Sequence, residues 1–208
     1  HIRSWGTPGT GSGQFSVPAG VAAGANTVVV ADTGNSRVQR FTATGFFLQR
    51  FGSAGSGPGQ FSAPRGIALD AQRNIYVADT GNHRVQVFDQ DGNFLRAFGQ
   101  KGDGPGEFDN PIAIEVDADG RIYVADFRND RIQVFDGGGD FIREFGQSGS
   151  GQGQLNRPAG LNVDANGNVA VADQDNDRVQ IFDPNGNFSL AVGQTGNGPG
   201  QLARPGGV

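Results

Sequence analysis

Recurring aspartate and arginine residues are the first candidates for chemistry in this chain. Each of four aspartates is followed five residues later by an arginine: Asp32 and Arg37, Asp79 and Arg84, Asp126 and Arg131, Asp173 and Arg178. A carboxylate beside a guanidinium forms a charge-assisted hydrogen bond, which either holds structure together or tunes a reactive group. Because a catalytic group is rarely needed four times, we expect a structural clamp worth about 1 kcal/mol or more where it is partly buried.

Metal and nucleophile chemistry has few candidates. The chain contains two histidines, His1 and His83, and no cysteine. A catalytic zinc needs three protein ligands of the His, Cys or carboxylate type, and the spacing suggests no Ser/His/Asp arrangement. We therefore predict no catalytic residue, no metal site and no cofactor in this segment.

Two Asp-x-Asp-Gly runs, at 89–92 and 117–120, raise the question of calcium. An EF-hand loop needs more ligands and a distal glutamate over twelve residues, and neither run supplies them. Asp, Asn and Gly are also the usual residues of tight turns. We interpret both runs as turns.

The elements that position these residues follow from a repeat of 47 residues. The aspartate and arginine columns keep this period, and so do phenylalanines at 41, 88, 135 and 182. One unit, starting at Pro64, contains the runs GIALD, NIYVAD, RVQVF and NFLRAFG, separated by Gly/Asn/Asp turns. These runs read as strands, and no segment keeps the 3.6-residue period of a helix. Four short antiparallel strands in a unit of about 40–50 residues indicate a β-propeller blade.

The units also resemble a known family. The run VADTGNHRVQVF at 77–88, its counterparts from residues 30, 124 and 171, and the P-x-G segments at 18, 64 and 158 resemble NHL repeats. Ala113 replaces the glycine in the third unit. The resemblance implies a six-bladed propeller, and it leaves the function open because the family includes enzymes, RNA binders and interaction scaffolds.

We predict an all-β propeller with four complete blades, at about residues 16–52, 62–99, 109–146 and 156–193 of a single domain or fragment spanning 1–208. HIRSWG at 1–6 matches the fourth, outer strand of a unit, and PGGV at 205–208 matches the first, inner strand. Six blades at this period need about 280 residues. We therefore expect a longer chain, or assembly with other chains, to complete the propeller.

Strand order places the turns between second and third strands, together with the connectors between blades, on one face, here called the top face. Loops on a rigid scaffold concentrate binding residues, and several top-face positions vary between units while the frame repeats. The candidate binding residues are Arg65, His83, Phe127, Arg128, Asp130, Asp175 and Asp177. Neutral drift on a solvated face is the alternative interpretation.

Composition narrows the function. The net charge is −5, which disfavours nucleic acid as a partner because RNA-binding propellers need a basic face with aromatics. No apolar run approaches the roughly 18 residues of a membrane span. We predict a non-enzymatic binding or scaffold module for a protein or peptide, with polysaccharide as a second partner class, in a larger extracytoplasmic or surface protein. The alternatives are an RNA-binding NHL propeller and the non-catalytic portion of an NHL-type lyase.

Overall fold

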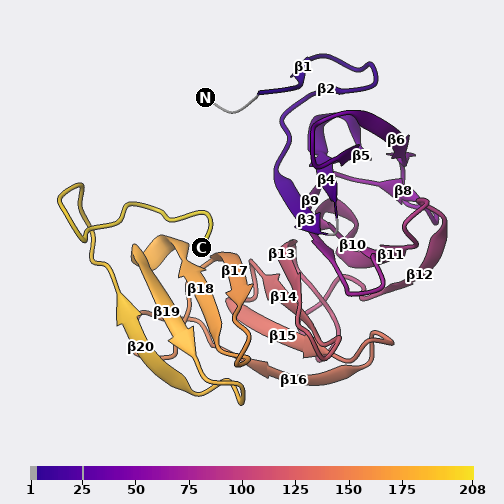
Figure 1. The fold of residues 1–208 in the computed structure, drawn as a ribbon. Helices are drawn as coiled ribbons and strands as arrows, with labels where there is room; N and C mark the ends of the chain where they lie inside the picture. Colours follow the sequence, from indigo (N-terminus) through magenta and orange to yellow (C-terminus); the bar gives the residue numbers. More distant parts are fainter. Residues whose placement is uncertain (1–3, 25) are drawn as a thin grey trace.

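Four four-stranded antiparallel sheets make up most of the molecule, a computed structural model that describes residues 4–24 and 26–208 (Figure 1). In each sheet the strands lie side by side in chain order, as expected for propeller blades. The first blade contains β3 (Gly20–Gly24), β4 (Thr27–Asp32), β5 (Arg37–Thr42) and β6 (Phe47–Phe51). The second contains β9 (Pro64–Leu69), β10 (Ile75–Asp79), β11 (Arg84–Phe88) and β12 (Phe94–Phe98).

The third blade contains β13 (Pro111–Val116), β14 (Ile122–Asp126), β15 (Arg131–Phe135) and β16 (Phe141–Phe145). The fourth contains β17 (Pro158–Val163), β18 (Val169–Asp173), β19 (Arg178–Phe182) and β20 (Phe188–Val192). The blades follow one another along an arc, with β3, β9, β13 and β17 on its inner side (Figure 1). The predicted fold of four complete propeller blades is confirmed.

Short elements outside the sheets were not expected from the sequence. Three top turns form 3₁₀ helices, η1 (Thr33–Asn35), η2 (Thr80–Asn82) and η3 (Gln174–Asn176), each closed by a residue in the left-handed region. Two connectors fold back on themselves as parallel pairs, β1 (Thr7–Pro8) with β2 (Gln14–Phe15) and β7 (Ser53–Ala54) with β8 (Gln60–Phe61). No helix in the described part of the chain is long and apolar enough to cross a membrane.

The core lies between the blades, and aromatic rings mark each junction. The Phe88 ring of the second blade lies 4.8 Å from that of Phe51, on the outer strand of the first blade, and 5.6 Å from that of Phe61 in the connector. Phe61 and Phe88 are both fully buried, and a buried phenylalanine contributes about 1.5–3 kcal/mol. Phe61, Phe108 and Leu155, one in each connector, are fully buried and pack between neighbouring blades.

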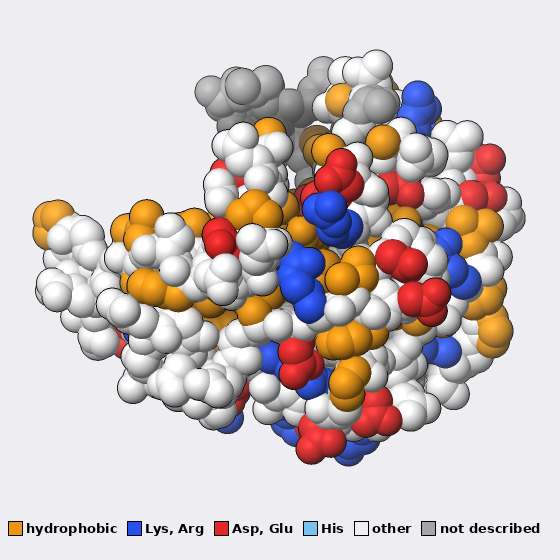
Figure 2. Space-filling view, turned by 90° about the horizontal axis from the view of Figure 1, so that it is seen from below, with side chains coloured by type: hydrophobic (Ala, Val, Ile, Leu, Met, Phe, Trp, Pro, Cys, Tyr) orange, Lys and Arg blue, Asp and Glu red, His pale blue; other side chains and the backbone are white. Residues whose placement is uncertain are grey.

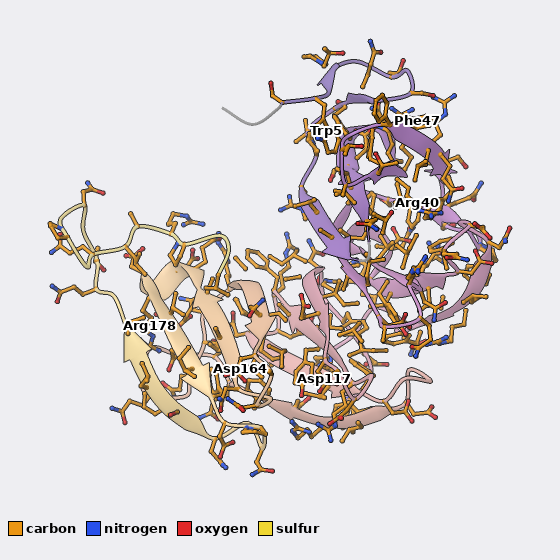
Figure 3. All side chains as sticks on the ribbon, in the orientation of Figure 1. Trp5, Arg40, Phe47, Asp117, Asp164 and Arg178 are labelled. Atoms are coloured by element: carbon orange, nitrogen blue, oxygen red, sulfur yellow. The ribbon has the colours of Figure 1, made fainter. Side chains whose placement is uncertain are left out.

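The two terminal segments take their expected places without forming strands. The Trp5 ring packs on Phe41 at 4.4 Å, beside Phe47 of the first blade (Figure 3). Residues 1–3 of the predicted outer strand lie outside the described residues, and 4–6 have no strand pairing. The backbone of Gly207 lies so close to the inner strand β17 that a Cβ on Gly160 would come within 2.7 Å of its Cα. Residues 205–208 are not a strand, because no neighbouring second strand pairs with them.

Candidate functional site

A buried aspartate at the end of each second strand is the centre of the repeated frame. In the second blade, Asp79 Oδ1 accepts the backbone N–H of Ser62 at 2.7 Å. Its Oδ2 accepts hydrogen bonds from Arg84 Nε at 2.9 Å, Asn82 Nδ2 at 2.9 Å and Gln86 Nε2 at 3.0 Å. Each carboxylate oxygen is thus engaged within the protein.

The arginine and glutamine of this clamp also hold the connector that enters the blade. Arg84 Nη2 donates to the carbonyls of Gly57 at 2.8 Å and Gln60 at 3.0 Å. Gln86 Nε2 donates to the Gln60 carbonyl at 2.7 Å, and its Oε1 accepts the Gly59 N–H at 2.9 Å. The same contacts recur around Asp32, Asp126 and Asp173. The repeated Asp and Arg residues therefore form the structural clamp that the sequence indicated.

Burial has an electrostatic consequence for the clamp of the third blade. It raises the pKa of the Asp126 carboxyl, and hydrogen bonds from Asn129, Asp109 N–H and Arg131 oppose that effect. The carboxylate therefore depends on its donors to remain ionised in the interior. Sequence reasoning missed the amide members of the clamp, although the glutamine column at 39, 86, 133 and 180 has the same 47-residue period.

Three of the predicted binding residues bridge from one blade to the segment that follows it. His83 Nδ1 accepts the backbone N–H of Asn110 at 3.2 Å and lies 3.4 Å from Asp109 Oδ1. Asp130 Oδ1 accepts the N–H of Arg157 at 2.8 Å, and Asp177 Oδ1 accepts the N–H of Arg204 at 2.8 Å. The structure thus gives His83, Asp130 and Asp177 a supporting role at the rim of the top face.

Phe127 and Asp175, two other predicted binding residues, meet through an arginine that was not among the candidates. The Arg157 guanidinium lies 5.9 Å from the centroid of the Phe127 ring, and Arg157 Nη1 lies 3.2 Å from Asp175 Oδ2. Asp175 Oδ1 also pairs with Arg204 Nη1 at 2.9 Å. The sequence did contain a signal for Arg157, because the position just before the proline of each unit varies. It holds Val17, Ala63, Asn110, Arg157 and Arg204.

A cavity of about 610 Å³ opens where the inner strands meet, with Arg65, Glu115, Phe127 and Gln174 in its wall. Arg65 and Arg128 are exposed, and neither has an ion pair within residues 4–24 and 26–208. Glu115 is half-buried, and burial raises the pKa of its carboxyl. Sequence reasoning missed Glu115, although it fills a column that otherwise holds Ala22, Ala68 and Asn162.

The Asp-rich turns on the opposite, bottom face are turns, as interpreted from the sequence. Asp89 Oδ1 accepts the N–H groups of Asp91 and Asn93, each at 2.9 Å, as in an Asx turn. Asp117 and Asp164 accept backbone N–H groups in the same way in the turns between the first and second strands of the third and fourth blades, near the lower ends of their sheets in Figure 3. Among the residues that the structure describes, no group of three or more His, Cys, Asp or Glu side chains is arranged to hold a metal ion.

Charge is unevenly distributed over the outer surface. Figure 2 shows side chains of both signs interspersed over the centre and right of the view, whereas the left end, which is the fourth blade, is mostly uncharged. On that end Val179 and Ile181 are partly exposed, while the corresponding Ile132 and Val134 of the third blade are fully buried. The difference arises because the fourth blade alone has no following sheet packed on it.

Comparisons with known proteins agree on the architecture. A family model described as a 6-bladed β-propeller matches residues 70–145, and an NHL-repeat model matches residues 15–41 and 155–182. No curated protein sequence matches the chain.

Solved structures with low sequence identity share the fold. A catalytically inactive virginiamycin B lyase from Staphylococcus aureus with quinupristin has 17% identity and a TM-score of 0.69, over 97% of this chain and 61% of that one. A streptogramin B lyase has 14% identity and a TM-score of 0.67, over 84% of this chain and 54% of that one. A structure of a nidogen/laminin complex has 23% identity and a TM-score of 0.65, over 86% and 69%. This chain thus spans little more than half the length of the lyases. It is built of β-propeller blades and contains NHL repeats.

Proposed function

We propose that this chain is a non-enzymatic binding module whose top face, around the mouth of the central cavity, engages a protein or peptide partner. The observation that carries the proposal is a contrast within each blade. The Asp-Arg-Gln-Asn clamps repeat with the same contacts, whereas the side chains they display at the mouth differ from blade to blade. A rigid frame with variable side chains is typical of a recognition surface.

Charge at the mouth favours an acidic segment of the partner. The aspartates there are already engaged, because Asp130 and Asp177 accept backbone N–H groups and Asp175 pairs with Arg157 and Arg204. Arg65 and Arg128 are exposed and form no ion pair with any described residue. Free guanidinium groups bind carboxylates through two parallel hydrogen bonds. The fold similarity to a chain in a nidogen/laminin complex supports a protein partner.

Peptide display tests the proposal without a known partner. Peptides selected on the immobilised protein should be rich in Asp and Glu and should bind at least about tenfold more weakly to Arg65→Ala and Arg128→Ala, since truncating a hot-spot residue costs about 2 kcal/mol or more. The matched control is Arg121→Ala, an exposed bottom-face arginine. Equal affinity for all three variants, or selection of no peptide at all, would refute a top-face binding site. Oligosaccharide arrays probed in parallel report the polysaccharide alternative.

A second candidate is the portion of an NHL-type lyase that does not itself carry the catalytic residues. The likeness to two lyases that are longer than this chain supports it. Incubation of the complete natural protein with quinupristin, followed by chromatography, tests it. Consumption of quinupristin that survives Arg65→Ala would favour the lyase over the binding module.

A further inference from the structure

The junction between the third and fourth blades, here called the third joint, departs from the other joints. At the first and second joints, the inner strands approach backbone to backbone. A Cβ on Gly20 would lie 2.2 Å from the Arg65 carbonyl oxygen, and a Cβ on Gly66 would lie 2.8 Å from the Ile112 carbonyl oxygen. Only glycine permits this approach.

Threonine closes the top of the first two joints. Thr33 Oγ1 donates to the Pro64 carbonyl at 2.6 Å, and Thr80 Oγ1 donates to the Pro111 carbonyl at 2.7 Å. Each bond ties a top turn to the inner strand of the next blade. These joints are therefore narrow on the channel side and closed on the top side.

The third joint has a larger side chain at each corresponding position. Ala113 replaces the glycine of the inner strand, Glu115 replaces Ala68, and Phe127 replaces Thr80. All three residues line the cavity of about 610 Å³, and β17 forms its opposite wall through Ala159 and Gly160. Phe127 cannot donate the hydrogen bond that threonine gives to the proline carbonyl.

Glu115 is the replacement expected to lower stability most, because its side chain forms no ion pair with any residue among 4–24 and 26–208. Burial raises the pKa of its carboxyl, and a hydrogen bond from the backbone N–H of Val116 opposes that effect only in part. A half-buried carboxylate without a counter-ion is unfavourable. Local departures from a repeat that lower stability are expected at functional sites.

We propose that the third joint is a subsite for a primary ammonium group, such as the end of a lysine side chain of the partner, with Glu115 as its counter-ion and Phe127 as an aromatic wall. The proposal rests on the proposed binding function and specifies one contact of it. Among the described residues that line the cavity, Glu115 is the acidic one, and it has no ion pair there, which favours a cation. The Phe127 ring already lies 5.9 Å from the Arg157 guanidinium, so it is placed to contact a cation.

The depth of the site selects a long, flexible cation. Glu115 lies three residues further along β13 than Ile112, the counterpart of Arg65 at the mouth. At about 3.3 Å per residue this places the carboxylate about 10 Å below the mouth. A lysine side chain carries its charge at the end of a four-carbon stem and buries that stem along apolar walls. A partner segment therefore fits the site if its acidic residues face Arg65 and Arg128 at the mouth and one lysine points inward to Glu115.

Carboxyl NMR gives a direct test, because the chain has three glutamates, Glu107, Glu115 and Glu144. In protein labelled with ¹³C at the glutamate carboxyl, n-butylammonium should shift the Glu115 signal and lower its pKa. The Glu107 and Glu144 signals are internal controls, and butyrate is the matched probe of opposite charge. An unperturbed Glu115 signal with n-butylammonium, or an equal shift with butyrate, would overturn the subsite.

Two variants that restore the residues of the other joints provide the second arm. Glu115→Ala and Phe127→Thr should raise the melting temperature and weaken binding of lysine-containing selected peptides by about tenfold or more. A lower melting temperature, or unchanged peptide affinity, contradicts the proposal. If Arg65→Ala still weakens those peptides while Glu115→Ala does not, the subsite fails and the top-face binding function stands.

Discussion

The Trp5 ring lies 4.4 Å from the Phe41 ring, and this contact repeats at the edge of the first blade the one that Phe51 makes with Phe88 at 4.8 Å. Phe98 with Phe135 at 4.9 Å and Phe145 with Phe182 at 4.8 Å complete the series. Trp5 thus covers the core of the first blade in the way that the outer strand of each of the first three blades covers the blade after it.

This relationship predicts that Trp5→Ala destabilises the protein. The side chain is 37% exposed, so the loss should be about 2 kcal/mol, below the 3–5 kcal/mol of a fully buried aromatic. Urea unfolding followed by circular dichroism measures it, because the variant removes the only tryptophan of the chain. Phe46→Ala, at a position 67% exposed, is the control and should change stability by less than about 0.5 kcal/mol. Equal losses of stability in the two variants would show that Trp5 does not cover the core of the first blade.

The clamp predicts an asymmetry between arginine and lysine. Arg84→Lys should lower the free energy of unfolding by about 2–4 kcal/mol, since lysine cannot bond Asp79 and the connector carbonyls Gly57 and Gln60 together. Arg121→Lys keeps a partly exposed pair with Asp117 and an exposed pair with Asp119, and it should cost less than about 1 kcal/mol. Urea titration of both variants makes the comparison, and a tolerated Arg84→Lys would argue that charge alone holds the clamp.

The repeat made the blades predictable, because its Asp, Arg and Phe columns fix both the strand order and the joints. The candidate site was less predictable. His83 and Asp130 look like free surface residues in the sequence, and only the structure shows that they accept backbone N–H groups 27 residues away. Glu115 was missed because strand alternation does not reveal that its column faces the next blade. That direction depends on how two blades pack, which no local pattern encodes.

The close approach of the inner strands predicts that Gly66→Ala is destabilising although its backbone is compatible with alanine. The new Cβ would lie 2.8 Å from the Ile112 carbonyl oxygen and 2.9 Å from the Ala113 Cα, and both are backbone atoms that cannot turn away. We expect a loss of about 1–3 kcal/mol, measured by thermal or urea unfolding. Gly206→Ala, which has no heavy atom within 4 Å of its Cβ position, is the matched control. Comparable stability of the two variants would mean that the strands can separate freely.

The bottom turns predict a pH dependence with a definite sign. The Asn168 side chain and backbone donate to Asp164, and these hydrogen bonds lower the pKa of its carboxyl. A carboxyl whose folded pKa lies below its unfolded value of about 3.9 stabilises the fold above that value, and the contribution is lost as pH falls through the folded pKa. Asn168→Ala should therefore raise the Asp164 pKa and destabilise the protein at pH 7, with the difference fading below about pH 4.

Carboxyl NMR titration and urea unfolding at several pH values measure both effects. Asn166→Ala is the control for this turn, since Asn166 contributes its backbone N–H to Asp164 and that group remains in the variant. Asp164 should keep its low pKa in this control. A destabilisation by Asn168→Ala that persists unchanged at pH 2 would mean that Asn168 supports the turn through packing, because a protonated Asp164 no longer offers the charge that strengthens the bond.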